Sequence, residues 1–366
     1  MSPDSPVGFG RPGGSGGGIY CRGAGELHLI SSTVSGNHAG DGGFGGVSGS
    51  PGGYGGGIFS EETLYVTNST ISGNFAGNGG ASGGDPAGGN GGSGGGIAGY
   101  GTFFIEHSTI SENTAGSGAE TGPDGDGGGI SHFHSTNPLT LINSIVTNNT
   151  ASNNADIAGT IDVSMGVNLT SGDPRLAPLG DYGGHTRTMP PLPGSPAIES
   201  GVLLAGTPSL DQRDAARLSG ELPDIGAVEA FAFSTLPLVD TDLDGIDDRI
   251  ETGIFGSLTT ATATSDFDGD RHTDRDEISN MTDPRDGQSL FQITDFKCAA
   301  DFDPLTNPAY RVTVQTFPGL TYELEGNTSP DSFAPIGGSA FTATGFSETS
   351  EIILTEAEYF VRAIRK

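Results

Sequence analysis

Four blocks of eleven residues align without gaps, and they constrain the fold more than any other feature of the chain. They are LHLISSTVSGN (27–37), LYVTNSTISGN (64–74), FFIEHSTISEN (103–113) and LTLINSIVTNN (139–149). Successive blocks start 37, 39 and 36 residues apart, and a Gly-Gly-Gly-Ile signal precedes each one. A period of this size is typical of repeat proteins, in which each unit stacks on the next.

Apolar and polar residues alternate within each block, which predicts strands with one buried face. A single strand cannot bury that face, but turns stacked about 4.8 Å apart would place like residues in continuous interior columns. We therefore predict an all-β fold built on a parallel β-helix, with repeats over residues 1–154. The matching apolar positions are Leu27, Leu29 and Val34; Leu64, Val66 and Ile71; Phe103, Ile105 and Ile110; and Leu139, Leu141 and Val146.

The end of each block and the spacer that follows it carry two further expectations. An asparagine closes every block, at Asn37, Asn74, Asn113 and Asn149. Its side chain tolerates a left-handed backbone and can bond to the same residue one turn away, so we expect an asparagine ladder. Spacers such as residues 76–96 contain little apolar surface to offset the entropy of ordering, so we expect them to loop out as solvated filler.

The succession of GGGI and STISGN resembles the repeats of polymorphic outer-membrane and related bacterial surface proteins. The resemblance covers roughly residues 16–170 and implies a right-handed parallel β-helix of the pectin-lyase-like kind. It says little about activity, because this scaffold hosts adhesins, lyases and hydrolases.

Residues 155–232 leave the block pattern and closely resemble the choice-of-anchor Q domain, which ends β-helix repeats in secreted bacterial proteins. The motifs GDP (172–174), GG (183–184), GSPAI (194–198), DQR (211–213) and DIGA (224–227) occur in the family's order. Glu199 and Asp214 depart from it, where aspartate and glycine are usual. An open strand edge invites aggregation, so we expect this segment to add the last turns and to cover the last one.

Four polar residues of this segment are weighed as a catalytic cleft: Asp211, Arg213, Asp224 and Glu229. An arginine among carboxylates favours a structural fork, so no catalytic residue is assigned.

The stretch DTDLDGIDDRIE (240–251) spaces its acids as an EF-hand calcium loop does. A hard divalent cation suits its oxygen-only ligand set, and the flexible loop favours Ca²⁺ over Mg²⁺. Gly245 stands at the sharp-turn position. The predicted ligands are Asp240, Asp242, Asp244, the Ile246 carbonyl, Asp248 and a bidentate Glu251.

A second loop, DFDGDRHTDRDE (266–277), repeats the spacing, but Arg271 occupies the sharp-turn position. That departure makes it the weaker prediction. Its ligands are Asp266, Asp268, Asp270, the His272 carbonyl, Asp274 and Glu277.

Residues 238–286 hold 14 acids against four arginines, so like charges would crowd without cations. A solvated acidic linker is the alternative. With ISNMTDPRD (278–286), the loops resemble thrombospondin type 3 and dockerin-like calcium repeats, which join modules in secreted bacterial proteins. A dockerin would imply a cohesin partner, but the position between modules favours a spacer.

The tail, residues 288–366, alternates short apolar runs with Pro, Gly and Asn, which predicts a small β-sandwich. It resembles the C-terminal modules of multidomain secreted bacterial proteins.

Charge limits the classes of partner, and the cysteine and apolar content limits disulfides and membrane segments. The net charge of −30 repels phosphate backbones and anionic lipid, so we expect neither nucleic acid nor a membrane surface as partner. No transmembrane segment is predicted, and Cys21 and Cys298 are expected to be free. A signal peptide is not visible, and we expect the N-terminus to be incomplete.

Two classes of function remain open. The preferred hypothesis is a secreted or cell-surface, non-enzymatic, calcium-stabilised β-helix protein that contacts extracellular matrix, polysaccharide or a cell-surface component. The alternative is a polysaccharide lyase or glycoside hydrolase. A lyase needs a basic group, but no lysine precedes Lys297. A hydrolase needs clustered carboxylates, for which the repeats offer Glu106 and Glu112, with Glu26, Glu61 and Glu62 outside the blocks. His107, His132 and His134 could act as metal ligands or proton shuttles. The preferred interpretation is that they are exposed strand residues without such a role.

Overall fold

The structure is a computed structural model. It describes residues 10–23, 25–83, 88–133, 136–218, 222–230, 239–289, 293–298, 309–316, 321–327, 334–336, 340–342, 347–353 and 360–365. The chain divides into two compact units: one holds residues 1–191, 196–217 and 223–236, and the other holds residues 192–195, 218–222 and 237–366.

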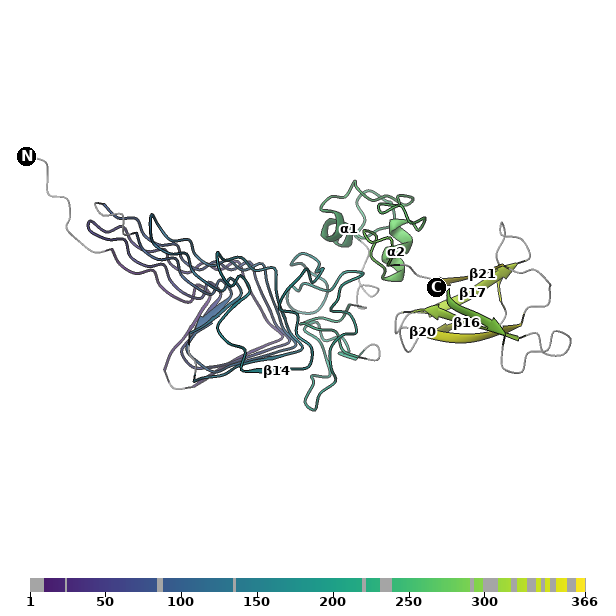
Figure 1. Cartoon of the computed structure of the whole chain (residues 1–366), viewed down its shortest axis with the longest axis horizontal. Helices are drawn as coiled ribbons and strands as arrows, with labels where there is room; N and C mark the ends of the chain where they lie inside the picture. Colours follow the sequence, from purple (N-terminus) through teal and green to yellow (C-terminus); the bar gives the residue numbers. More distant parts are fainter. Residues whose placement is uncertain are drawn as a thin grey trace, which may run out of the picture. The chain divides into compact units, whose positions relative to one another are not determined.

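The first unit is a parallel β-solenoid whose stacked turns appear as nested triangular outlines in Figure 1. Each of the first four turns supplies one strand to each of three parallel sheets, and the last turn supplies strands to two of them. The first sheet holds β1 (Ile19–Cys21), β4 (Ile58–Ser60), β7 (Ile97–Gly99), β10 (Ile130–His132) and β13 (Ile157–Ala158). The second holds β2 (Glu26–Ile30), β5 (Thr63–Thr67), β8 (Phe103–Glu106), β11 (Leu139–Ile142) and β14 (Val163–Met165). The third holds β3 (Thr33–Ser35), β6 (Thr70–Ser72), β9 (Thr109–Ser111) and β12 (Ile145–Val146).

The predicted interior columns are confirmed. Val34 pairs with Ile71, Ile71 with Ile110, and Ile110 with Val146. These residues belong to a single buried cluster with the other predicted positions, and Leu27 packs against it from the first turn. The isoleucines of the Gly-Gly-Gly-Ile signals form a further column, which ends at Ile157. The prediction of an all-β parallel β-helix is therefore correct.

The asparagine ladder is also present. The side-chain amide of Asn37 donates to Asn74 Oδ1, that of Asn74 to Asn113 Oδ1, and that of Asn113 to Asn149 Oδ1, each at 2.9 Å. Asp156 ends the ladder by accepting from Asn149 at 3.1 Å. The expectation that these asparagines are left-handed is wrong, because the left-handed residues precede them: Gly36, Gly73, Glu112 and Asn148. The asparagines instead use their side chains to link the turns.

The glycine-rich spacers do not loop out as solvated filler, which corrects the sequence expectation. Their described residues (10–18, 39–57, 76–83, 88–96 and 115–129), called here the glycine array, extend from one corner of the stack (Figure 1). Glycine N–H groups donate to carbonyls at 2.8–2.9 Å, alternately between neighbouring spacers and within one spacer, through Gly40 to Gly14, Gly53 to Gly40, Gly77 to Gly53, Gly92 to Gly77, Gly116 to Gly92 and Gly125 to Gly116.

Donors towards one neighbouring segment recur at every third residue, as Gly77, Gly80 and Gly83 do towards residues 45–53. That period is the one of a polyproline II helix. A Cβ at Gly116 would lie 1.9 Å from the Gly77 carbonyl oxygen, so the close approach requires glycine. Backbone hydrogen bonds rather than apolar burial order these segments, which is why a composition-based entropy argument missed them.

The segment after the repeats lies along the side of the stack rather than over its last turn. Gln212 exchanges side-chain hydrogen bonds with Thr33 (2.9 Å) and Thr70 (2.6 Å). Ala227 N–H donates to Thr109 Oγ1 at 3.1 Å, and Gly226 N–H donates to the Asn143 carbonyl at 2.8 Å. The segment thus bonds to four successive turns.

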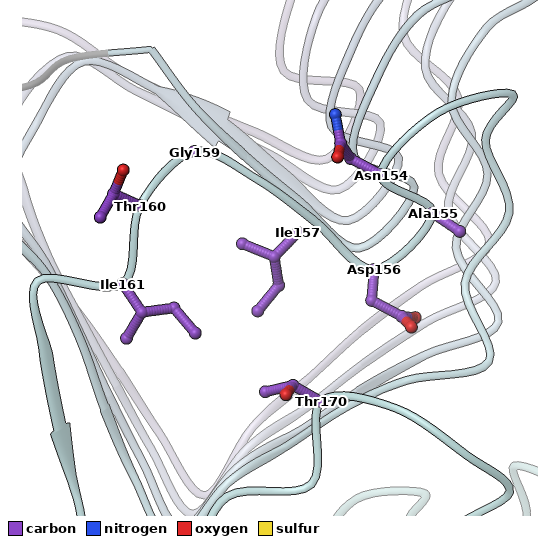
Figure 2. A pocket seen from close by; sticks show the side chains of 8 residues that line it. All are labelled: Asn154, Ala155, Asp156, Ile157, Gly159, Thr160, Ile161 and Thr170. Carbon is purple, nitrogen blue, oxygen red and sulfur yellow. The ribbon is translucent and has the colours of Figure 1, made fainter.

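Figure 2 shows the end of the solenoid that we expected this segment to cover. Among the described residues, those that line the hollow there belong to the last turn, with Ile157 and Ile161 inside it: Asn154, Ala155, Asp156, Ile157, Gly159, Thr160, Ile161 and Thr170. The described part of the segment after the repeats is called here the lateral brace, because its polar contacts are made along the side of the stack, with Thr33, Thr70, Thr109 and Asn143.

The second unit contains the acidic region and the tail. Two short helices, α1 (Asp248–Phe255) and α2 (Asp274–Asn280), follow the acidic loops. The tail forms two antiparallel sheets, one of β15 (Ile293–Cys298), β16 (Ala309–Gln315) and β20 (Ser347–Ile353). The other is built on β17 (Thr321–Asn327), which pairs with β18 (Ala334–Pro335), β19 (Phe341–Thr342) and β21 (Phe360–Arg365).

No helix among the described residues is both long enough and apolar enough to cross a membrane. Cys21 is a free thiol. The Cys298 side chain and residue His134 lie outside the described part of the chain.

Candidate metal centres

The two acidic loops have the same backbone. Asp240 accepts hydrogen bonds from the N–H groups of Leu243 (2.7 Å), Asp244 (3.2 Å) and Gly245 (2.9 Å). In the second loop Asp266 accepts from the residues at the same three positions, Gly269 (2.8 Å), Asp270 (3.1 Å) and Arg271 (3.0 Å). Each first aspartate thus turns the loop around its own carboxylate.

The remaining internal contacts of the loops also correspond. Ile246 N–H donates to Asp244 and His272 N–H donates to Asp270, at 2.8 and 2.7 Å. The aspartates at position 9 close both loops: Asp248 accepts from Thr241 N–H at 2.8 Å, and Asp274 accepts from Phe267 N–H at 2.9 Å.

The two loops carry their glycine at different positions, and their backbone angles explain why both arrangements fold. Both loops adopt positive φ at positions 4 and 6, with Leu243 at 63° and Gly245 at 89° in the first, and Gly269 at 80° and Arg271 at 83° in the second. Each loop therefore places glycine at one left-handed position and strains a different residue at the other. Arg271 does not change the course of the second loop.

Predicted ligand atoms gather in three groups, two that share Asp242 in the first loop and a separate one in the second. Ligand oxygens of Asp240, Asp242 and Asp248 lie within 4.8 Å of one another, as do those of Asp242, Asp244 and Glu251. In the second loop the same holds for Asp266, Asp268 and Asp270. Asp274 and Glu277 are not part of that group.

The two glutamates at position 12 are the most informative side chains of the region. Glu251 is fully buried and Glu277 is 2% exposed, and no carboxylate oxygen of either accepts a hydrogen bond. Oxygens of Asp244, Asp268 and Asp270 are likewise buried without a partner. Burial of an uncompensated carboxylate is costly, so these are the oxygens that a bound cation would compensate.

The electrostatics of the glutamates agree with this geometry. Burial, with the charges of Asp242 and Asp244, raises the pKa of Glu251 to about 7. Burial, with the charges of Asp268 and Asp270, raises the pKa of Glu277 to about 9. Each carboxylate thus faces its own loop and lacks a positive partner there.

The donor set fits a hard divalent cation. It consists of oxygens alone, from two acidic loops of EF-hand length, and no histidine nitrogen or thiolate takes part. Residues that hold Ca²⁺ in this way would supply four aspartates and one glutamate from each loop.

The polar residues of the lateral brace form a separate, buried network. Arg213 bonds to Asp211 through Nε at 3.1 Å and Nη2 at 2.9 Å, and Arg217 pairs with Glu229 at 3.0 Å. Asp224 accepts from the N–H groups of Glu199 and Ala230, both at 2.6 Å. Asp211, Arg213, Asp224 and Glu229 are all buried, as in the structural fork that the sequence favoured. The sequence did not single out Arg217, which contacts Asn68 of the solenoid at 2.7 Å.

The solenoid acids weighed for catalysis have separate partners in the described structure. Glu26 pairs with His28, Glu61 with Arg22, and Glu112 accepts from Ser72. Gly23 N–H donates to Glu62.

Glu106 and His107 line a hollow formed with residues 204–207. Burial raises the pKa of Glu106, while burial and the Arg217 charge lower the pKa of His107 to about 3. Both effects favour the neutral imidazole of His107.

A scan of protein-family models, a search of curated proteins and a search of solved structures found no match to this chain.

Proposed function

We propose that this chain is a non-enzymatic, calcium-stabilised β-helix protein, secreted or displayed at the cell surface, that contacts extracellular matrix or polysaccharide. The observation that carries the proposal is the burial of Glu251 and Glu277, whose carboxylates face further acids without any hydrogen bond. A bound Ca²⁺ would supply the missing positive charge and allow both loops to stay ordered.

Calcium dependence favours an extracellular setting. Ca²⁺ is millimolar outside cells, so sites of about ten-micromolar affinity would be nearly saturated there and would gain roughly 2.7 kcal/mol of stability. The resemblances to the choice-of-anchor Q domain, to thrombospondin type 3 repeats and to C-terminal sandwich modules favour the same setting.

The solenoid supports a contact role with a repetitive partner. Like positions recur on each turn, and outward rings form a column in which His28 and Tyr65 lie 4.5 Å apart and Tyr65 and Phe104 lie 5.0 Å apart. A polymer with a short chemical repeat can meet such a column at several points, so weak contacts add.

Calcium withdrawal tests the proposal on the full chain. Peptides from residues 239–289 should lose hydrogen-exchange protection in EGTA and regain it in 1 mM Ca²⁺, while peptides from the solenoid stay unchanged. The matched control is the double variant Glu251→Gln and Glu277→Gln, which removes both charges and should abolish the calcium response. Equal protection with and without Ca²⁺ in the unaltered protein would refute the calcium sites.

One observation keeps the enzymatic alternative in view, namely the half-buried Glu106 beside His107 in a hollow of the solenoid. A screen of acidic and neutral polysaccharides, scored for both retention and bond cleavage, separates the two functions. Retention without products supports a binding protein. New reducing ends or unsaturated products that disappear in Glu106→Gln would establish a lyase or hydrolase.

A further inference from the structure

The second acidic loop has a buried carboxylate outside its twelve residues. Asp283 follows α2 and is 1% exposed. The chain turns back at Met281, which adopts a φ of 61°, and Thr282 then donates to the Glu277 carbonyl through N–H at 3.0 Å and Oγ1 at 3.3 Å. Asp283 is thereby brought beside the position-12 glutamate.

The charge of Asp283 acts on Glu277 together with those of the loop acids Asp268, Asp270 and Asp274. A few residues later the chain lies against the loop itself: a Cβ at Gly287 would lie 3.4 Å from Asp270 Cβ and 3.8 Å from Asp268 Cγ. Residues 282–287 therefore lie against the acidic side chains of the second loop.

The Asp283 carboxylate is held in a defined orientation. Its Oδ1 accepts from Arg285 N–H at 3.2 Å and lies 3.5 Å from Arg285 Nε. Arg285 is fixed in turn by donation from Nη1 to the Ile254 carbonyl at 3.3 Å. The Asp283 N–H donates to Ser289 Oγ at 2.9 Å.

The first loop is closed differently. The charges that act on Glu251 come from Asp242, Asp244 and Asp248, all within that loop, and the segment after α1 brings the Ala261 amide instead of an acid. The two sites thus differ by one carboxylate.

We propose that Asp283 is a sixth carboxylate ligand of the second acidic loop and makes it the stronger of the two calcium sites. The inference rests on the proposed function and reverses the order that Arg271 indicated. It also draws on the two unbonded oxygens of Glu277, which is buried and faces the loop acids. Ligand charge and ligand number are the features that tune calcium affinity in such loops.

The test is calorimetric titration of the EGTA-treated full chain with CaCl₂. Glu251→Gln and Glu277→Gln first assign the two binding steps to the two loops. Asp283→Asn should then weaken the Glu277-dependent step by about ten- to a hundredfold and leave the Glu251-dependent step unchanged. Asparagine keeps an oxygen that can accept from Arg285, so a merely orienting role survives this substitution.

Asp286→Asn is the matched control, because Asp286 is an exposed acid of the same turn. It should leave both steps within twofold. Equal affinities in Asp283→Asn and Asp286→Asn would overturn the assignment of Asp283 while leaving the calcium sites intact. Absence of both steps in the unaltered chain would refute the proposed function itself, so the two failures are distinguishable.

Discussion

The solenoid and the acidic loops are both repeats, but they satisfy their buried polar groups in opposite ways. In the solenoid each amide of the asparagine ladder finds its partner one turn away, as Asn113 does between Asn74 and Asn149. In the acidic region like charges converge instead, and Glu251 and Glu277 have no partner among the described residues. The ladder is therefore satisfied within the chain, whereas the proposed function assigns the charge of the acidic loops a partner from solution.

This difference indicates how the two regions respond to their surroundings. A ladder of neutral amides gains nothing from salt, calcium or a change of pH near neutrality. On the proposed function, the converging carboxylates of the acidic loops would depend on all three, because a bound cation would offset their repulsion. The contrast can therefore be measured as a change in stability when an asparagine is removed from the ladder, or when Ca²⁺ is added to the acidic loops.

The largest loss in the free energy of unfolding is expected from Asn113→Ala, in the centre of the ladder. Asn113 accepts from Asn74 and donates to Asn149 and to the Ile71 carbonyl, at 2.9 Å in each case. Groups left without partners in the buried interior cost about 1–3 kcal/mol each, so a loss of about 3–5 kcal/mol is predicted. Denaturant unfolding followed by circular dichroism measures it, with and without Ca²⁺.

Asn37→Ala is the matched control for that substitution. Asn37 ends the ladder and is only half-buried, so water can replace part of what is lost, and a cost near 1 kcal/mol is expected. A calcium-dependent loss at Asn113 would contradict the independence of the two regions.

A smaller effect is expected in the glycine array. Gly116→Ala would place a methyl group 1.9 Å from the Gly77 carbonyl oxygen, and overpacking of this kind costs about 1–3 kcal/mol. Gly14→Ala is the control, since a Cβ there meets nothing within 4 Å. Thermal unfolding of both variants tests whether the array is a packed element. If the two were equally stable, the spacers would be the solvated filler that their composition suggests.

The pH dependence of the calcium-free acidic region follows from its glutamates. The pKa values of about 7 for Glu251 and about 9 for Glu277 lie above the usual 4.5, so the folded state holds protons that the unfolded state has released. Stability in EGTA is thus greatest below pH 4.5 and falls as the pH rises towards 9.

Hydrogen exchange of residues 239–289 between pH 5 and 9, corrected for intrinsic rates, checks this dependence. The double variant Glu251→Gln and Glu277→Gln should flatten the profile. A rise in stability with pH in the absence of Ca²⁺ would contradict it. With Ca²⁺ present the trend should reverse, because the cation competes with protons for the same oxygens.

The spacing of residues that are close together in the sequence predicted the interior columns of the solenoid and the grouping of acids in the loops. Period-two alternation placed Val34, Ile71 and Ile110 in one column, and the EF-hand spacing gathered Asp240, Asp242 and Asp248. Order in the glycine array escaped prediction because it comes from backbone hydrogen bonds between segments far apart in sequence. The lateral brace escaped because the polar contacts of Gln212 reach partners some 180 residues away.

The candidate site shows the same division. Asp283 stands outside the twelve-residue pattern, and only the reversal of the chain at Met281 brings it back to Glu277. The segment TDPRD after the second loop was the available signal, since an acid before proline at a helix end favours such a turn.

The smallest effect is expected where the two acidic loops differ in backbone strain. Arg271 holds a φ of 83°, close to the 89° of Gly245 at the same position of the first loop. A left-handed conformation costs a non-glycine residue about 1–2 kcal/mol, and glycine returns about 0.5–1 kcal/mol of that as unfolded-state entropy. Arg271→Gly should therefore stabilise the second loop by about 0.5–1 kcal/mol and tighten its calcium step severalfold.

Arg271→Gln removes the same charge but keeps the strain, so the difference between the two variants in a calcium titration isolates the cost of the left-handed backbone. Equal affinities for the glycine and glutamine variants would show that the loop adopts this turn without strain.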